Sequence, residues 1–241
     1  MNTQRSSTET VLRLALWCGV AMLAALGVAA AIGRAASVAS GGLTYDQIQQ
    51  LLPAEMVREA FEFDGWFAAH PVLTFLHVLL GSIFLILSPF QFSSRLRNRY
   101  VRFHRWSGRV LVLVALPVGL SGLVLAALFP YGGPAAASAA FVAGAFFLVA
   151  LTQAFLAIRR RDVARHREWM IRVFSIGLGI ATVRIVGLLL FAITGARFQD
   201  MAGFSFWGGW VSTFAAAELW IRHTRPRRVA VSVIPVRGTG A

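Results

Sequence analysis

Six long apolar stretches dominate this sequence and limit what the chain can fold into. Each approaches or exceeds the roughly 20 apolar residues that a helix needs to cross a bilayer core. Hydrocarbon offers the backbone no hydrogen-bond partners, so stretches of this length and composition must be helical. The sequence therefore predicts an all-α integral membrane bundle of six transmembrane helices, over Val11 to Ile32, Val72 to Phe92, Val110 to Phe129, Ala135 to Ile158, Ile171 to Ile193 and Phe204 to Ile221.

The composition agrees with a membrane protein and excludes several other classes. The chain has 57% hydrophobic and 14% charged residues, and its mean hydropathy is +0.68. All 23 Lys and Arg residues are arginine, and the net charge is +13. These arginines lie in short runs between apolar stretches, so we expect no nucleic-acid binding. The single cysteine, Cys18, excludes an intrachain disulfide and a thiolate metal cluster.

The arginine runs also predict the orientation. Arginine-rich loops follow the second and fourth apolar stretches, an arginine-rich tail follows the sixth, and arginine-poor loops alternate with them. Positive loops remain in the cytoplasm, so both termini should be cytoplasmic. The runs are Arg95, Arg97, Arg99, Arg102 and Arg105, then Arg159, Arg160, Arg161, Arg165 and Arg167, and finally Arg222, Arg225, Arg227 and Arg228.

These signals divide the chain into four parts. Residues 1–33 form the N-terminal transmembrane helix, and residues 34–69 form an extracytoplasmic amphipathic segment between helices 1 and 2. Residues 70–222 form a five-helix membrane core, and residues 223–241 a disordered basic cytoplasmic tail. A cleaved signal peptide is the alternative for the first part. Its apolar run exceeds the ~7 to 15 residues of a signal core, which favours an uncleaved anchor.

The segment at residues 34–69 carries helix signals of its own. Thr44 and Gln47 have the spacing of a capping box, and Pro53 can open a second short helix that ends near Asp64 and Gly65. Apolar residues follow one side of both helices. We therefore expect the segment to lie on the outer bilayer surface or to cap the bundle.

Two polar residues fall deep inside predicted spans. His77 lies roughly 10 Å and Arg184 roughly 13 Å from the outer ends of their helices, at 1.5 Å per residue. An arginine at that depth keeps its charge and needs an acceptor, yet no carboxylate is predicted at the same depth. Backbone carbonyls, water or a bound anionic group remain as acceptors. Both residues are candidates for a ligand-binding site, with helix packing as the alternative role.

A second polar group is predicted at the inner ends of the spans. His104 and His166 lie in similar arginine-rich runs, and Gln91, Gln153 and Glu218 fall near the inner ends of their helices. These residues could line an inner pocket. The surrounding arginines could equally contact lipid headgroups, and the set assigned to that role is Arg102, Arg105, Arg109, Arg165, Arg167 and Arg172.

The same runs resemble a known family. Gln91, the His-Arg-x-x-Gly-Arg run ending at Arg109, the Arg-His-x-x-Trp-Met-x-Arg run ending at Arg172, and Ala-Thr-Val-Arg ending at Arg184 are similar to the bacterial membrane family called domain of unknown function 2306. The likeness spans about His70 to Ile193. It implies a multi-helix membrane domain without an established activity, and a location in the bacterial cytoplasmic membrane.

Three functional hypotheses remain open. The first is a binding or transport protein for a lipid, quinone or small anionic ligand, held by Arg184 and His77 or by the inner histidines and arginines. The second is a b-type haem protein with His104 and His166 as axial ligands. The third is an accessory subunit that scaffolds a partner membrane protein. We expect no catalytic metal site, and the sequence does not decide whether the protein is an enzyme.

Overall fold

The computed structural model is helical throughout its described parts, residues 2–128 and 132–225. The helices are α1 (Asn2–Ala39), α2 (Tyr45–Leu51), α3 (Ala54–Ala69), α4 (Pro71–Phe92), α5 (Ser94–Arg99), α6 (Val101–Leu128), α7 (Gly133–Arg159), α8 (Val163–Thr194) and α9 (Phe198–Thr224). The all-α prediction is confirmed. Most of the predicted basic tail lies outside the described residues, although residues 223–224 continue α9.

Among the described residues, five helices are long and apolar enough to cross a membrane. They are α1 from Thr10, α4, α6, α7 and α8. The sixth predicted stretch forms most of α9, which has 27 residues but is not among these five helices. Five of the predicted stretches are thus helices of the expected kind, and the count of six spans stays a prediction.

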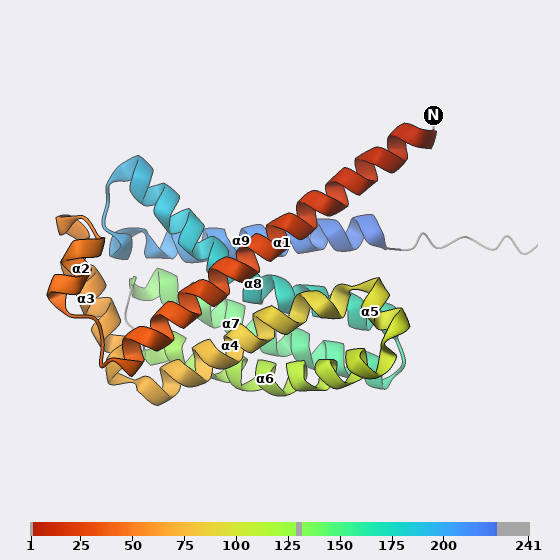
Figure 1. The fold of residues 1–241 in the computed structure, drawn as a ribbon, viewed down its shortest axis with the longest axis horizontal. Coiled ribbons are helices and arrows are strands. Elements are labelled where there is room, and N and C mark those ends of the chain that lie inside the picture. The colour runs from red at the N-terminus through yellow and green to blue at the C-terminus, as the bar shows by residue number, and fades with distance from the viewer. Residues whose placement is uncertain (1, 129–131, 226–241) are drawn as a thin grey trace, which may run out of the picture.

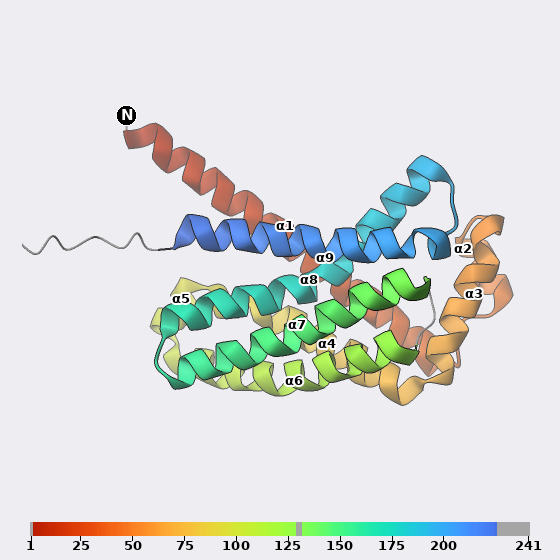
Figure 2. The same ribbon diagram turned by 180° about the vertical axis from the view of Figure 1, so that it is seen from behind.

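The long helices alternate in direction, so the bundle has two distinct ends. We call one the basic end: it holds α5, the turn between α7 and α8, and the C-terminal end of α9 (Figures 1 and 2). We call the other the capped end: α2 and α3 lie across it, beside the turn that joins α8 to α9. The first described residues of α1 point in the same direction as the basic end. The predicted alternation of arginine-rich and arginine-poor connections therefore appears as two ends of one bundle.

Two helices depart from the common direction of the bundle. α1 crosses the bundle diagonally, packs on α4 and α8, and extends beyond them at its N-terminal half (Figure 1). α8 bends in its second half and leaves the plane of α6 and α7 (Figure 2). Two side chains donate hydrogen bonds to carbonyls of this part of α8. Trp210 Nε1 donates to the Ile176 carbonyl at 3.1 Å, and Arg184 Nη1 donates to the Ile180 carbonyl at 2.9 Å. Side-chain hydrogen bonds to helix carbonyls commonly accompany such bends.

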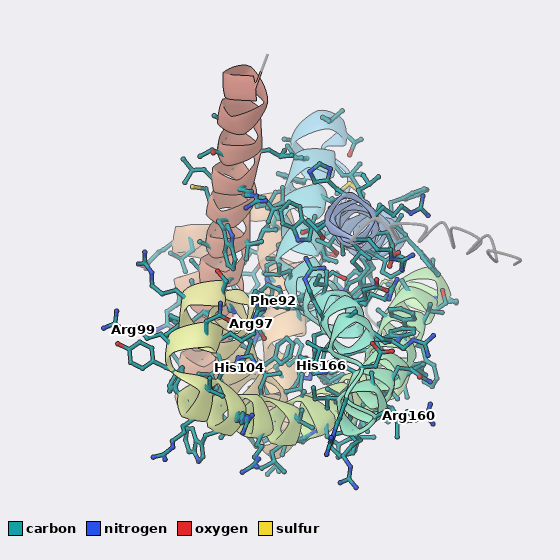
Figure 3. All side chains as sticks on the ribbon, turned by 90° about the vertical axis from the view of Figure 1, so that its right-hand side faces the viewer. Phe92, Arg97, Arg99, His104, Arg160 and His166 are labelled. Atoms are coloured by element: carbon teal, nitrogen blue, oxygen red, sulfur yellow. The ribbon has the colours of Figure 1, made fainter. Side chains whose placement is uncertain are left out.

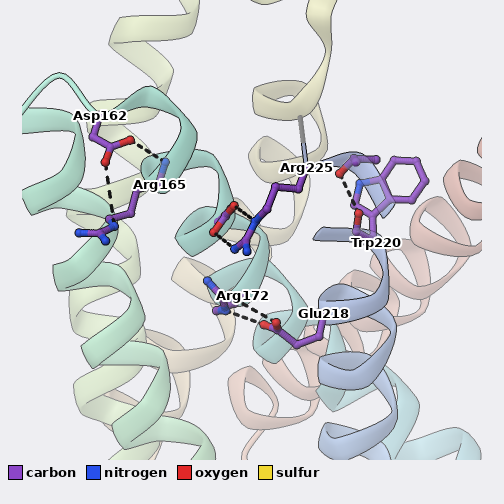
Figure 4. Close-up of polar contacts among 8 residues, drawn as sticks. Asp162, Arg165, Arg172, Glu218, Trp220 and Arg225 are labelled. Carbon is purple, nitrogen blue, oxygen red and sulfur yellow. Dashed lines mark hydrogen bonds and ion pairs between the residues drawn. The ribbon is translucent and has the colours of Figure 1, made fainter. Parts of the chain in front are cut away.

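The most extensive helix contact in the described chain joins α8 and α9. A glycine allows the closest approach, because a Cβ at Gly209 would lie 2.5 Å from the backbone nitrogen of Val183. Near the basic end, Arg172 donates two hydrogen bonds to Glu218, at 2.5 and 3.1 Å (Figure 4). Arg225 donates two more to Glu168, both at 2.8 Å. These bidentate pairs fix the register of α9 on α8.

The predicted segment at residues 34–69, which we call the capping segment, contains helices that start where the sequence predicted, but its second helix ends at a different residue. Thr44 caps α2, and both hydrogen bonds of the capping box with Gln47 are present. Pro53 is the N-cap of α3, so the helix starts within one residue of the predicted position. However, α3 continues to Ala69, and α1 continues to Ala39, so the predicted segment starts inside α1. The segment covers one end of the bundle.

The basic runs form helix where the sequence predicted loops. α6 starts at Val101 and α8 at Val163, so both histidine-containing runs belong to the first turns of these helices. A short helix, α5, precedes α6 and was not predicted. Its start is explained by Ser93, whose hydroxyl accepts from the Leu96 amide at 3.4 Å. Asp162 caps α8 in the same way through the Arg165 amide.

Candidate functional site

A cavity of about 290 Å³ lies among α1, α4, α6, α7, α8 and α9, and α3 contributes to its wall near the capped end. We call it the chamber. Its wall is mostly apolar and includes many small residues, among them Gly27, Ala31, Gly81, Gly122, Ala140 and Gly144. Its charged or titratable lining residues are Arg34, His77 and Arg184. Concave apolar sites with a few polar groups are the usual form of small-molecule sites.

Glycines around the chamber have two different effects. A Cβ at Gly119 would lie 2.5 Å from Leu148 Cδ2, and one at Gly177 would lie 2.7 Å from Phe84 Cε1, so these glycines allow helices to pack closely. A Cβ at Gly81 would meet no atom within 4 Å. Gly81 therefore leaves open space on the chamber wall, and larger side chains could occupy that space.

Arg184 is charged but has no acidic partner in the chamber. It is an exposed residue that lines the chamber, and its guanidinium donates a hydrogen bond to the Ile180 carbonyl of its own helix. Among the described ion pairs, none involves Arg184. The nearby charge of Arg34 repels it. A guanidinium has five N–H donors, so most of its donor capacity is available to a ligand or to water.

His77 lines the same chamber from α4. Its Nδ1 lies 3.0 Å from Ser121 Oγ, and the Ser121 hydroxyl donates to the Pro117 carbonyl at 2.7 Å. The direction of the hydrogen bond between His77 and Ser121 follows the tautomer of the His77 ring. His77 and Arg184, which the sequence placed at similar depths, thus line the same cavity. Ligand binding by either residue stays a prediction.

Arg34 is the chamber residue that sequence reasoning missed. Its guanidinium pairs with Asp64 and lies over the rings of Phe63 and Phe67, at 5.0 and 4.6 Å from their centres. Asp64 also accepts from Ser37 Oγ at 2.7 Å. This network joins α1 to α3 and gives the Arg34 guanidinium an acidic partner. The sequence showed opposite charges at the edges of two helices, but not that those edges meet.

The inner candidates lie apart from the chamber. His104 and His166 face each other from α6 and α8 at the basic end (Figure 3). Neither lines the chamber or a second, smaller cavity, whose wall includes Ile48 and Leu51 of α2. Gln91 donates to Ser107 Oγ at 2.7 Å between α4 and α6. Gln153 is an exposed residue of α7. A shared inner pocket for these residues stays a prediction.

The arginines assigned to lipid headgroups differ in their surroundings. Arg102, Arg105, Arg109 and Arg165 are exposed, as headgroup contact requires. The other two, Arg167 and Arg172, have partners within the protein. Arg167 Nη2 donates to Thr224 Oγ1 at 2.8 Å. Arg172 pairs with Glu218 and lies 4.7 Å from the centre of the Trp169 ring. The pairing of Arg172 with Glu218 favours a structural role for Arg172, in contrast to the lipid contact predicted from the sequence.

The haem hypothesis requires two imidazoles on different helices as axial ligands, and His104 of α6 and His166 of α8 meet this requirement. His166 Nδ1 lies 2.9 Å from the Ala154 carbonyl, which leaves Nε2 for another partner. However, neither of the two cavities described above includes these rings. Within the described residues, no group of three His, Cys, Asp or Glu side chains could hold a metal ion. Haem binding therefore stays a prediction.

The family relationship agrees with this architecture. The family model described as Predicted membrane protein (DUF2306) matches residues 74–221, more than half of the chain. The chain belongs to this family. The match extends from α4 into the end of α9, so it includes most of the chamber wall but neither α1 nor the capping segment. No curated protein and no solved structure matches the chain. As the sequence resemblance predicted, it is a multi-pass membrane protein of this family.

Proposed function

We propose that this protein binds an amphipathic lipid anion in the chamber. The observation that carries the proposal is the placement of Arg184, whose guanidinium faces an apolar chamber without an acidic partner among the described residues. A charge in such surroundings is costly unless an anion or water compensates it. The head group would bind Arg184, and its apolar chain would lie along the glycine and alanine wall.

The other ligand classes predicted from the sequence fit this chamber less completely. A small inorganic anion could neutralise Arg184, but it would leave the large apolar wall uncovered. A quinone could fill the apolar space and accept a hydrogen bond, but it would not neutralise the guanidinium. A lipid anion does both. His77 also lines the chamber and adds an imidazole that can form a hydrogen bond with the same ligand.

Native mass spectrometry of the protein in mild detergent tests this proposal. Wild type should retain an acidic lipid species, and Arg184→Gln should lower its occupancy about tenfold, because a charged hydrogen bond contributes roughly 1.5 to 3 kcal/mol. Arg160→Gln is the matched control, since it removes one arginine from an exposed turn. Equal lipid retention by wild type and Arg184→Gln would refute the role of Arg184.

We further propose that α9 is a sixth span and that the basic end faces the cytoplasm of a bacterial inner membrane. With 27 residues, α9 is about 40 Å long at 1.5 Å per residue and could span the hydrocarbon core. The two bidentate ion pairs of the α8–α9 contact favour a path of α9 through the bilayer alongside α8. The capping segment would then be extracytoplasmic, and both termini cytoplasmic.

Cysteine labelling in intact cells tests this topology. After Cys18→Ser, a cysteine introduced by Ala196→Cys before α9 should react with a membrane-impermeant maleimide. A cysteine introduced by Gly240→Cys near the C-terminus should react only after the cells are permeabilised. Equal labelling of both positions in intact cells would contradict a spanning α9. The reverse pattern would contradict the orientation.

A further inference from the structure

A second polar site lies at the basic end, away from the chamber. Figure 3 shows His104 of α6 opposite His166 of α8, with Arg97 of α5 near them. The charges of Arg97 and His166 both act on His104. The charge of Arg97 also acts on Arg167. Cationic or titratable groups from three helices therefore converge on one region.

Neither imidazole is fully used by contacts within the protein. Nδ1 of His166 donates to the Ala154 carbonyl, so Nε2 is left for another partner and can donate to an anion when the ring is an imidazolium. Nδ1 of His104 is buried and has no hydrogen-bond partner among the described residues. Buried polar atoms without a partner are rare and call for an explanation.

The carboxylates of this end are already paired with other groups. Asp162 caps α8 and contacts Arg165, and Glu218 binds Arg172. Glu168 moderates the charge of Arg167 but accepts two hydrogen bonds from Arg225. The cluster of Arg97, His104, His166 and Arg167 thus keeps an excess of positive charge.

Helix geometry adds to this charge. His104 and His166 each occupy the fourth position of their helix, so the N-terminal ends of α6 and α8 lie close to the two rings. These ends carry partial positive charge. α6 has no acidic residue in its first turn to compensate it. Side chains and helix ends therefore favour the same kind of ligand, an anion.

From this arrangement we propose that Arg97, His104, His166 and Arg167 bind a phosphate group. Phosphate has several acceptor oxygens and can accept from donors that arrive from three helices. It can come from a phospholipid headgroup at the membrane surface or from free phosphate in solution. The site is separate from the chamber and does not depend on the ligand proposed there.

Two measurements on the purified full chain distinguish the sources. Titration with inorganic phosphate, followed by ³¹P NMR line broadening, detects free phosphate. Native mass spectrometry of the Arg184→Gln protein, in which the chamber ligand is weakened, counts the phospholipids retained elsewhere after extraction in a phosphate-free detergent. Binding in either measurement is expected when the basic end is unchanged, and the measurement that responds identifies the source. Binding in neither would overturn the proposal.

Variants connect the binding to these residues. H104N together with H166N, and separately R97Q, should each weaken the responding signal about tenfold, because each removes hydrogen-bonding groups from the proposed site. R97Q changes an exposed side chain and so tests the site even if the double variant fails to fold. R160Q is the matched control and should bind as wild type does. Wild-type binding by R97Q, or a haem Soret band that H104N abolishes, would overturn the proposal.

Discussion

Arg172 and Arg184 lie on the same helix, yet the structure gives them opposite surroundings. Arg172 pairs with Glu218 across the contact between α8 and α9. Arg184 lines the chamber and bonds to a carbonyl of its own helix. They are twelve residues apart, which turns their side chains by roughly 120° around the helix axis. One arginine therefore faces another helix, and the other faces a cavity.

This difference shows how an arginine within a helical bundle can be interpreted. A guanidinium with a bidentate carboxylate has its charge neutralised by the protein, and its role is to fix helix register. A guanidinium that faces open space keeps its donors for a ligand. We therefore expect variants at the first site to lower stability, and variants at the second to lower ligand binding with little loss of stability.

The largest expected effect comes from breaking the Arg172 pair. Glu218→Ala leaves a half-buried guanidinium without its carboxylate and should lower the free energy of unfolding by about 3 kcal/mol. Thermal unfolding in detergent measures the change. Arg184→Ala is the comparison, and its unfolding temperature should stay close to that of wild type. Equal destabilisation by both variants would remove the distinction between the two arginines.

A smaller loss of stability is expected where α8 and α9 approach most closely. Gly209→Ala places a Cβ 2.5 Å from the backbone nitrogen of Val183, so the helices must move apart. We expect a loss of about 2 kcal/mol, within the usual range for overpacked sites. The neighbouring Gly208→Ala is the control, because its Cβ would make an ordinary contact, 3.5 Å from Val186 Cγ1. Similar unfolding temperatures for the two variants would contradict the described packing.

The smallest effect on stability is expected from filling the chamber. A Cβ at Gly81 meets no atom within 4 Å, so Gly81→Leu should fold and occupy space on the chamber wall. It should reduce the retained lipid seen by native mass spectrometry while changing the unfolding temperature little. Gly19→Leu is the matched control, since that position is equally open but does not line the chamber. Full lipid retention in Gly81→Leu would place the ligand elsewhere.

The sequence predicted the helices better than it predicted their contacts. Apolar length alone located five membrane-type helices, and matched depth placed His77 and Arg184 at one cavity. The basic runs were assigned to loops because charge breaks an apolar pattern, although arginine is compatible with helix. Their helical form depends on caps such as Ser93 and Asp162.

The missed features depend on how helices meet. The pairing of Arg172 with Glu218 requires the register of α9 on α8, which the periodicity of either helix does not contain. Arg34 joins the chamber because α1 crosses the bundle diagonally toward α3 (Figure 1). The chamber itself depends on which glycines pack against a neighbour and which leave space. A sequence shows the glycines but not which of the two they do.

The most direct test of the account is an experimental density map of the wild-type protein in lipid nanodiscs. We predict continuous density within the chamber that begins at the Arg184 guanidinium and follows the wall past Gly81, with no such density at Arg172. A chamber closed by helix packing, or an Arg184 side chain directed outward to bulk lipid, would contradict the central claim.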